Sequence, residues 1–145
     1  REYGLFEAYR MEDAEIALVL IGSSAGTAKV TVDALRARGI PAGLVKIRVF
    51  RPFPAEELAQ TLKNVKALAI LDKAESFSAQ GGPLFAEVRA ALYDLEPRPR
   101  TVGYVYGLGG RDITPAHFAS VFARLEAIAA GGELGPVYSH LGQRG

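Results

Sequence analysis

The sequence contains no cysteine, and only two of its 145 residues are histidine. Without cysteine the chain can form no disulfide, carry no thiol nucleophile, and hold no cysteine-ligated zinc ion or iron–sulfur cluster. His117 and His140 are isolated from each other and make no metal site. The absence of cysteine also fits a reducing compartment, so we expect a cytoplasmic protein.

The sequence also lacks an excess of charge of either sign and has no long apolar runs. The chain has 17 Lys and Arg residues against 16 Asp and Glu, so its net charge of +1 gives no reason to expect nucleic acid or an anionic membrane as a partner. No apolar run approaches the ~20 residues of a membrane span, and no signal peptide is visible. Because 49% of the residues are apolar, we expect one domain with a sizeable core.

Apolar runs alternate with helical patterns along the chain. Two of the runs are almost continuously apolar, as in central parallel strands that are covered on both faces. The runs predict strands over Ile16–Ile21, Leu44–Phe50, Ala67–Leu71 and Thr101–Tyr106, with a weaker edge strand over Leu5–Arg10. Helices are predicted over 27–38, 55–62, 84–95 and 115–130, the last capped by Thr114 with Pro115 at its first position. This alternation predicts a three-layer α/β fold with right-handed crossovers.

The C-terminal stretch from Gly131 onward is rich in glycine and then polar. Such segments are typical of linkers. We therefore predict a domain over residues 1–130 and a tail or linker to a following domain over 131–145. Because the sequence also begins with Arg1 rather than methionine, we expect it to be a piece of a longer polypeptide.

Ligands and partners of parallel α/β sheets are met at the carboxyl ends of the strands. The loop Gly22-Ser23-Ser24-Ala25-Gly26 at one of these ends has the spelling of a nucleophile elbow, and Ser24, Asp72 and His117 follow the chain order of an α/β-hydrolase triad. However, this loop follows the first clear strand, no oxyanion loop precedes it, and His117 falls near the third position of a helix. We favour Ser24 as a helix cap, and a small serine hydrolase stays an alternative.

A second alternative is a nucleotide- or CoA-binding module. The same loop matches neither G-x-G-x-x-G nor the P-loop pattern. The next strand ends near Arg48 and Arg51, where a dinucleotide site would have an acid for the ribose. Arg51 could accept a phosphate, or pair with an acid such as Asp72 or with a partner chain.

The other glycine-rich loop, "YGLGGRDITP" at 106–115, has too many glycines for an ordinary short connector. We interpret it as a surface that docks against another domain.

Three segments in order carry a resemblance to a known family. They are "YRMEDAEIALVLIGSSAGTAKVTVDALRARGIPAGLVKIRVFRPFP", "AILDKAESFSAQGGPLFAEV" and "VGYVYGLGGRDITP". Together they resemble the second domain of pyruvate:ferredoxin oxidoreductases and related 2-oxoacid:ferredoxin oxidoreductases, whose α subunits carry it. The resemblance covers residues 9 to about 128, and the same plan resembles the C-terminal domain of transketolases.

The resemblance implies a mixed sheet of five strands in the order 1-3-2-4-5, with strand 1 antiparallel at the edge. Enzymes of the family use thiamine pyrophosphate with Mg²⁺, iron–sulfur clusters and coenzyme A to convert pyruvate and CoA to acetyl-CoA and CO₂ while reducing ferredoxin. Their cofactor-binding and cluster-binding motifs lie on other domains. The resemblance therefore implies that this fragment alone carries no catalytic residue, binds no cofactor or metal, and is inactive by itself.

What the resemblance carries over is a rim of loop residues. We expect this rim to contact neighbouring domains or subunits of an oligomeric parent enzyme. Its members match the family's motif positions and are Gly22, Ser23, Ser24, Arg51, Pro52, Asp72, Lys73, Gly81, Gly82, Pro83, Gly109, Gly110, Arg111 and Asp112.

Overall fold

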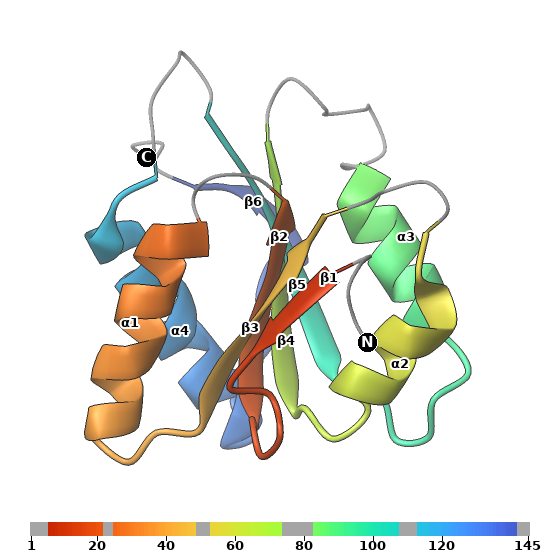
Figure 1. Ribbon diagram of the computed structural model, residues 1–145, viewed down its shortest axis with the longest axis horizontal. Coiled ribbons are helices and arrows are strands. Elements are labelled where there is room, and N and C mark those ends of the chain that lie inside the picture. Colours follow the sequence, from red (N-terminus) through yellow and green to blue (C-terminus); the bar gives the residue numbers. More distant parts are fainter. Residues whose placement is uncertain (1–5, 22–24, 49–52, 74–82, 108–112, 142–145) are drawn as a thin grey trace.

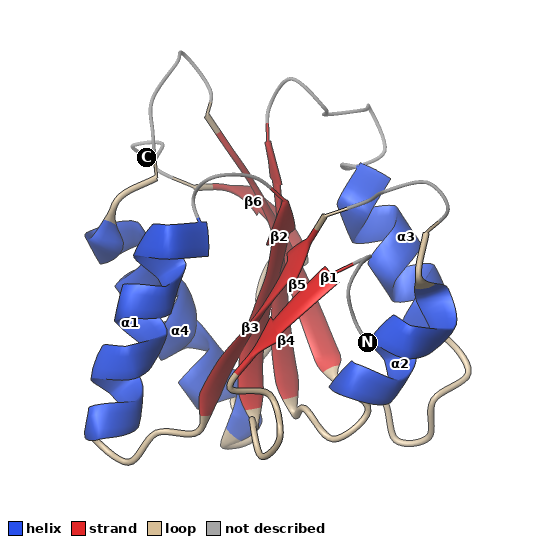
Figure 2. Cartoon of the chain, in the orientation of Figure 1, coloured by secondary structure: helices blue, strands red, loops and turns tan. Residues whose placement is uncertain are grey.

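The computed structural model describes residues 6–21, 25–48, 53–73, 83–107 and 113–141. A central sheet separates two pairs of helices, as the alternating pattern predicts (Figure 1). One face is covered by α1 (Ala25–Ala37) and α4 (Pro115–Ala129), and the other by α2 (Ala55–Leu62) and α3 (Pro83–Leu92). Figure 2 shows the three layers most directly.

Within these ranges the sheet has six strands in the order β1-β3-β2-β4-β5-β6. All neighbours are parallel except β1, which lies antiparallel to β3 at one edge. The predicted order and the antiparallel edge strand are therefore confirmed. The strands are β1 (Phe6–Tyr9), β2 (Ile16–Ile21), β3 (Ala42–Ile47), β4 (Ala67–Lys73), β5 (Arg100–Tyr106) and β6 (Tyr138–His140).

The central strands are apolar on both faces because each face meets a helical layer. In β2, Leu18 and Leu20 belong to the core beneath α1 and α4, whereas Ala17 and Val19 belong to the core beneath α2 and α3. Successive side chains of a strand point to opposite faces. The continuous apolar run thus fills two cores at once.

The predicted count of five strands was one short. The sixth strand, β6, lies inside the segment predicted as a tail and pairs with Gly103–Val105 of β5. Three residues of mixed polarity give no strand signal of their own, and the pairing depends on contacts from distant parts of the chain. The domain boundary at residue 130 stays a prediction.

The start of α4 is built as the sequence predicts. The backbone N–H of His117 donates to Thr114 Oγ1 at 3.3 Å, and the Thr114 N–H donates to His117 Nδ1 at 3.0 Å. This reciprocal pair satisfies two backbone donors at the helix start. Other predicted bounds shift by a few residues, since β3 begins at Ala42 and α3 ends at Leu92.

Candidate functional site

The structure describes three residues of the predicted rim: Asp72, Lys73 and the backbone of Pro83. Asp72 and Lys73 are the last two residues of β4, and Pro83 is the first residue of α3. The remaining rim residues lie outside the described part of the chain: Gly22, Ser23, Ser24, Arg51, Pro52, Gly81, Gly82, Gly109, Gly110, Arg111 and Asp112.

Asp72 is a buried carboxylate that caps α3. The whole Asp72 residue is 3% exposed. Its Oδ1 accepts a hydrogen bond from the backbone N–H of Leu84 and its Oδ2 from that of Phe85, each at 3.0 Å. Burial raises the pKa of the Asp72 carboxyl, while the two N–H donors act in the opposite direction. The first N–H groups of a helix have no partner within it. Asp72 thus joins the end of β4 to the start of α3. The sequence could indicate an acid at this strand end but not that its partners lie a dozen residues further on.

Tyr106 is a second residue that joins strand ends at this edge of the sheet, and it is the first residue of the glycine-rich stretch 106–115 that the sequence singles out. It is 3% exposed, and its hydroxyl donates to the carbonyl of Ile21 at 3.4 Å. Ile21 ends β2 and Tyr106 ends β5, and β4 lies between these strands. The contact therefore connects the two strand ends from which the glycine-rich loops leave.

The candidate hydrolase triad is not supported. The imidazole of His117 accepts from the Thr114 N–H in the cap of α4, and the Asp72 carboxylate is occupied in the cap of α3. The two groups are thus held at the starts of two different helices, α4 and α3. Ser24 lies outside the described residues.

Within the described ranges, no group of three or more His, Asp or Glu side chains could hold a metal ion. No helix in that part of the chain is both long enough and apolar enough to cross a bilayer.

Comparison with known proteins identifies the family. Residues 14–118 match the family model of pyruvate:ferredoxin oxidoreductase core domain II. The chain belongs to this family. The match runs from just before β2 to the first turn of α4, so it includes β2 through β5 and lies between the two edge strands, β1 and β6.

A curated relative of this core domain II is pyruvate synthase subunit PorA of Methanothermobacter thermautotrophicus, which is 50% identical over 126 residues. The alignment covers 87% of this chain and 32% of the relative. The chain thus spans about a third of the length of the curated relative it matches.

Two solved structures share the fold of core domain II. The 2-oxoglutarate:ferredoxin oxidoreductase from Magnetococcus marinus aligns with a TM-score of 0.62 at 20% identity, covering 88% of this chain and 20% of that one. A split-gene transketolase aligns with a TM-score of 0.52 at 24% identity, covering 68% of this chain and 32% of that one. The predicted likeness to transketolases is confirmed at the level of fold.

Proposed function

We propose that this chain is a non-catalytic assembly domain of a thiamine-pyrophosphate-dependent pyruvate:ferredoxin oxidoreductase. The parent enzyme would convert pyruvate and CoA to acetyl-CoA and CO₂ and pass the two electrons to ferredoxin. The observation that carries the proposal is the match of residues 14–118 to core domain II. The relative named pyruvate synthase favours pyruvate as the substrate.

The proposed work of the domain is to position its neighbours. Asp72 and Tyr106 hold the ends of β4 and β5 by hydrogen bonds, and predicted rim residues follow these strand ends in the sequence. Loops that follow the strands of a packed sheet suit a surface that meets other domains. A misplaced catalytic unit can lose about 100-fold in rate without any change in its chemistry.

The cofactors of the proposed enzyme would be held by other domains or subunits. These cofactors are thiamine pyrophosphate with Mg²⁺, iron–sulfur clusters and coenzyme A, and ferredoxin would be the electron acceptor of the whole enzyme. This division of roles agrees with the lack of cysteine in the chain. We propose a cytoplasmic oligomer in which the rim meets the partner domains.

The test is to change the rim in the parent enzyme. Arg111→Ala and Asp112→Ala are expected to reduce the fraction of assembled enzyme, measured by native mass spectrometry, and to lower CoA-dependent reduction of ferredoxin with pyruvate. The melting temperature of the isolated chain is expected to stay within about 2 °C of the unmodified chain, because side chains that act only at a contact with another domain add little to the stability of the chain by itself. Arg38→Ala, an exposed position just after α1, is the matched control. Full assembly and unmodified turnover in both rim variants would overturn the proposal.

A further inference from the structure

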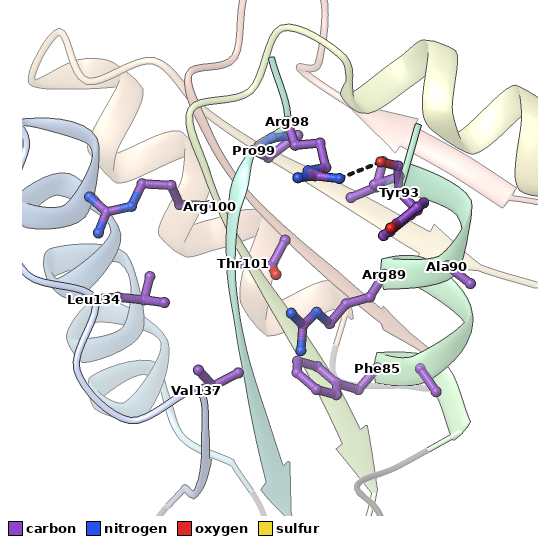
Figure 3. A pocket seen from close by; sticks show the side chains of 12 residues that line it. Phe85, Arg89, Ala90, Tyr93, Arg98, Pro99, Arg100, Thr101, Leu134 and Val137 are labelled. Atoms are coloured by element: carbon purple, nitrogen blue, oxygen red, sulfur yellow. Dashed lines mark hydrogen bonds between the residues drawn. The ribbon is translucent and has the colours of Figure 1, made fainter. Parts of the chain in front are cut away.

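A groove of about 840 Å³ lies between α3 and the outer edge of β5. Figure 3 shows Arg89 and Tyr93 reaching in from α3 and the turn that follows it, with Leu134 and Val137 on the other side of the strand. Arg98, Pro99 and Arg100 lie at the start of β5, at the opposite end of the strand from the rim. The groove is therefore a surface separate from the rim, and a ligand could occupy it whether or not the proposed function is correct.

Three arginines give this groove a positive charge that no acid of its described lining balances. The guanidinium of Arg89 lies 5.1 Å from the centre of the Phe85 ring, and that of Arg98 lies 5.3 Å from the centre of the Tyr93 ring. Arg98 also donates to the Tyr93 carbonyl (Figure 3), and Arg100 donates to the Gly132 carbonyl at 2.9 Å. The described residues that line the groove include no Asp or Glu. Aromatic rings and carbonyls thus hold the guanidiniums in place without neutralising them.

Arg100 and Thr101 of β5 line the groove, and they lie at the start of the β5 edge, which has no neighbouring strand in the described part of the chain. All seven residues of β5 pair with β4, but only Gly103, Tyr104 and Val105 pair with β6. The Gly103 N–H donates to the Val137 carbonyl, and the Val105 carbonyl accepts from the Leu141 N–H. Because backbone groups alternate in direction along a strand, the N–H and C=O of Thr101 point to this same edge. They lie beside the groove, just before the point where β6 begins.

We propose that this groove binds an extended acidic segment of a partner subunit, which adds to the β5 edge as a strand at Thr101 and places carboxylates against Arg89 and Arg98. An unpaired strand edge offers backbone donors and acceptors to such a segment. Alternate side chains of the added strand would face α3, where Arg89 and Arg98 lie, and the others would face Leu134 and Val137. Tyr93 is 70% exposed and Val137 is 38% exposed, so the segment would also cover apolar surface.

The test uses a fluorescent acetyl-Glu-Val-Glu-Val-Glu-amide peptide titrated against the full 145-residue chain. The glutamates can face the arginines while the valines face Leu134. Binding is expected to raise the anisotropy and to shift the Thr101 amide resonance. Acetyl-Lys-Val-Lys-Val-Lys-amide and a backbone N-methylated glutamyl peptide are the controls, and neither is expected to bind.

Arginine variants then test the charge. Arg89→Gln and Arg98→Gln are each expected to weaken peptide binding about threefold, as for partly exposed ion pairs, and the double variant about tenfold. Arg89→Lys keeps the charge and is expected to lose less than Arg89→Gln, and Arg38→Gln is the control away from the groove. Equal binding of the lysyl or N-methylated peptide, or unchanged affinity in the double variant, would overturn the proposal. Inorganic phosphate displacing the peptide at equal concentration would also overturn it, because the groove would then be a small-anion site.

Discussion

Among the single residues, Asp72 is an acid whose charge is buried at the start of a helix. Its raised pKa means that the folded chain binds the proton more tightly than the unfolded chain does. The free energy of unfolding therefore falls as the pH rises from the unfolded pKa of about 3.9 through the higher folded value. Asp72→Asn is expected to flatten this slope, measured by urea unfolding at a series of pH values. Asp72→Ala is expected to cost about 2 kcal/mol, because it strips the acceptors from two backbone donors of α3.

Glu7 is a control for this experiment, because its pKa shift and its effect on the pH dependence of stability are opposite in sign to those of Asp72. The Lys29 ammonium, which donates to the Glu7 carboxylate at 2.7 Å, holds the pKa of Glu7 below its usual value. The stability that Glu7 contributes is present above the unfolded pKa and is lost as the pH falls through the folded one. Glu7→Gln should therefore abolish the part of the fall in unfolding free energy at low pH that comes from protonating Glu7. An unchanged pH slope in Asp72→Asn, with the Glu7→Gln effect present, would contradict the role given to Asp72.

Gly103 is a second residue whose identity is fixed by its neighbours. A Cβ at this position would lie 2.6 Å from both Phe85 Cε1 and Tyr138 Cδ1, whose rings pack with their centres 4.9 Å apart. Gly103→Ala is expected to cost about 1–3 kcal/mol of unfolding free energy, since the rings must shift. Gly26→Ala, where a Cβ would meet nothing within 4 Å, is the matched control and is expected to cost nothing. Equal urea midpoints for the two variants would show that the ring packing is not tight.

Among the helices and strands, the segment that leads into β6 is bonded by one arginine of α4. Arg124 donates to the Tyr104 hydroxyl at 2.9 Å and to the carbonyls of Leu134 and Pro136, which precede β6. Arg124→Ala is expected to cost about 2 kcal/mol and to speed hydrogen exchange of the Gly103 and Leu141 amides, which bond across the β5–β6 region. Arg124→Lys should retain part of the protection. Unchanged exchange at both amides would contradict this role.

The elements differ in how far the sequence could predict them. The apolar runs of β2 and β4 and the Thr114 cap of α4 are local signals, and the structure confirms them. The order of the strands came from the family resemblance, because the alternation of elements alone does not fix which strands are neighbours. β6 could not be predicted, since it is held by contacts with β5 and Arg124 that lie elsewhere in the chain. The role of Asp72 could not be predicted either, since its backbone donors lie a dozen residues further along the sequence.

Across the chain as a whole the charges nearly cancel, yet three arginines gather in one groove. With a net charge of +1 there is little long-range attraction for an acidic partner. Any salt dependence of glutamyl-peptide binding should therefore reflect the groove itself. We expect the affinity to fall several-fold between about 0.05 M and about 0.5 M salt, as the Debye length shortens, measured by anisotropy. Binding that is insensitive to salt would contradict a role for the guanidiniums.

In the described part of the chain the start of the outer β5 edge has no neighbouring strand, and this has a consequence for the purified chain. Exposed strand edges are sites where identical molecules join and aggregate. If two copies met at this edge, Arg89, Arg98 and Arg100 of one would face the same three residues of the other. The mutual repulsion of these like charges disfavours such self-association, so the residues proposed to attract an acidic partner would also keep copies of the chain apart.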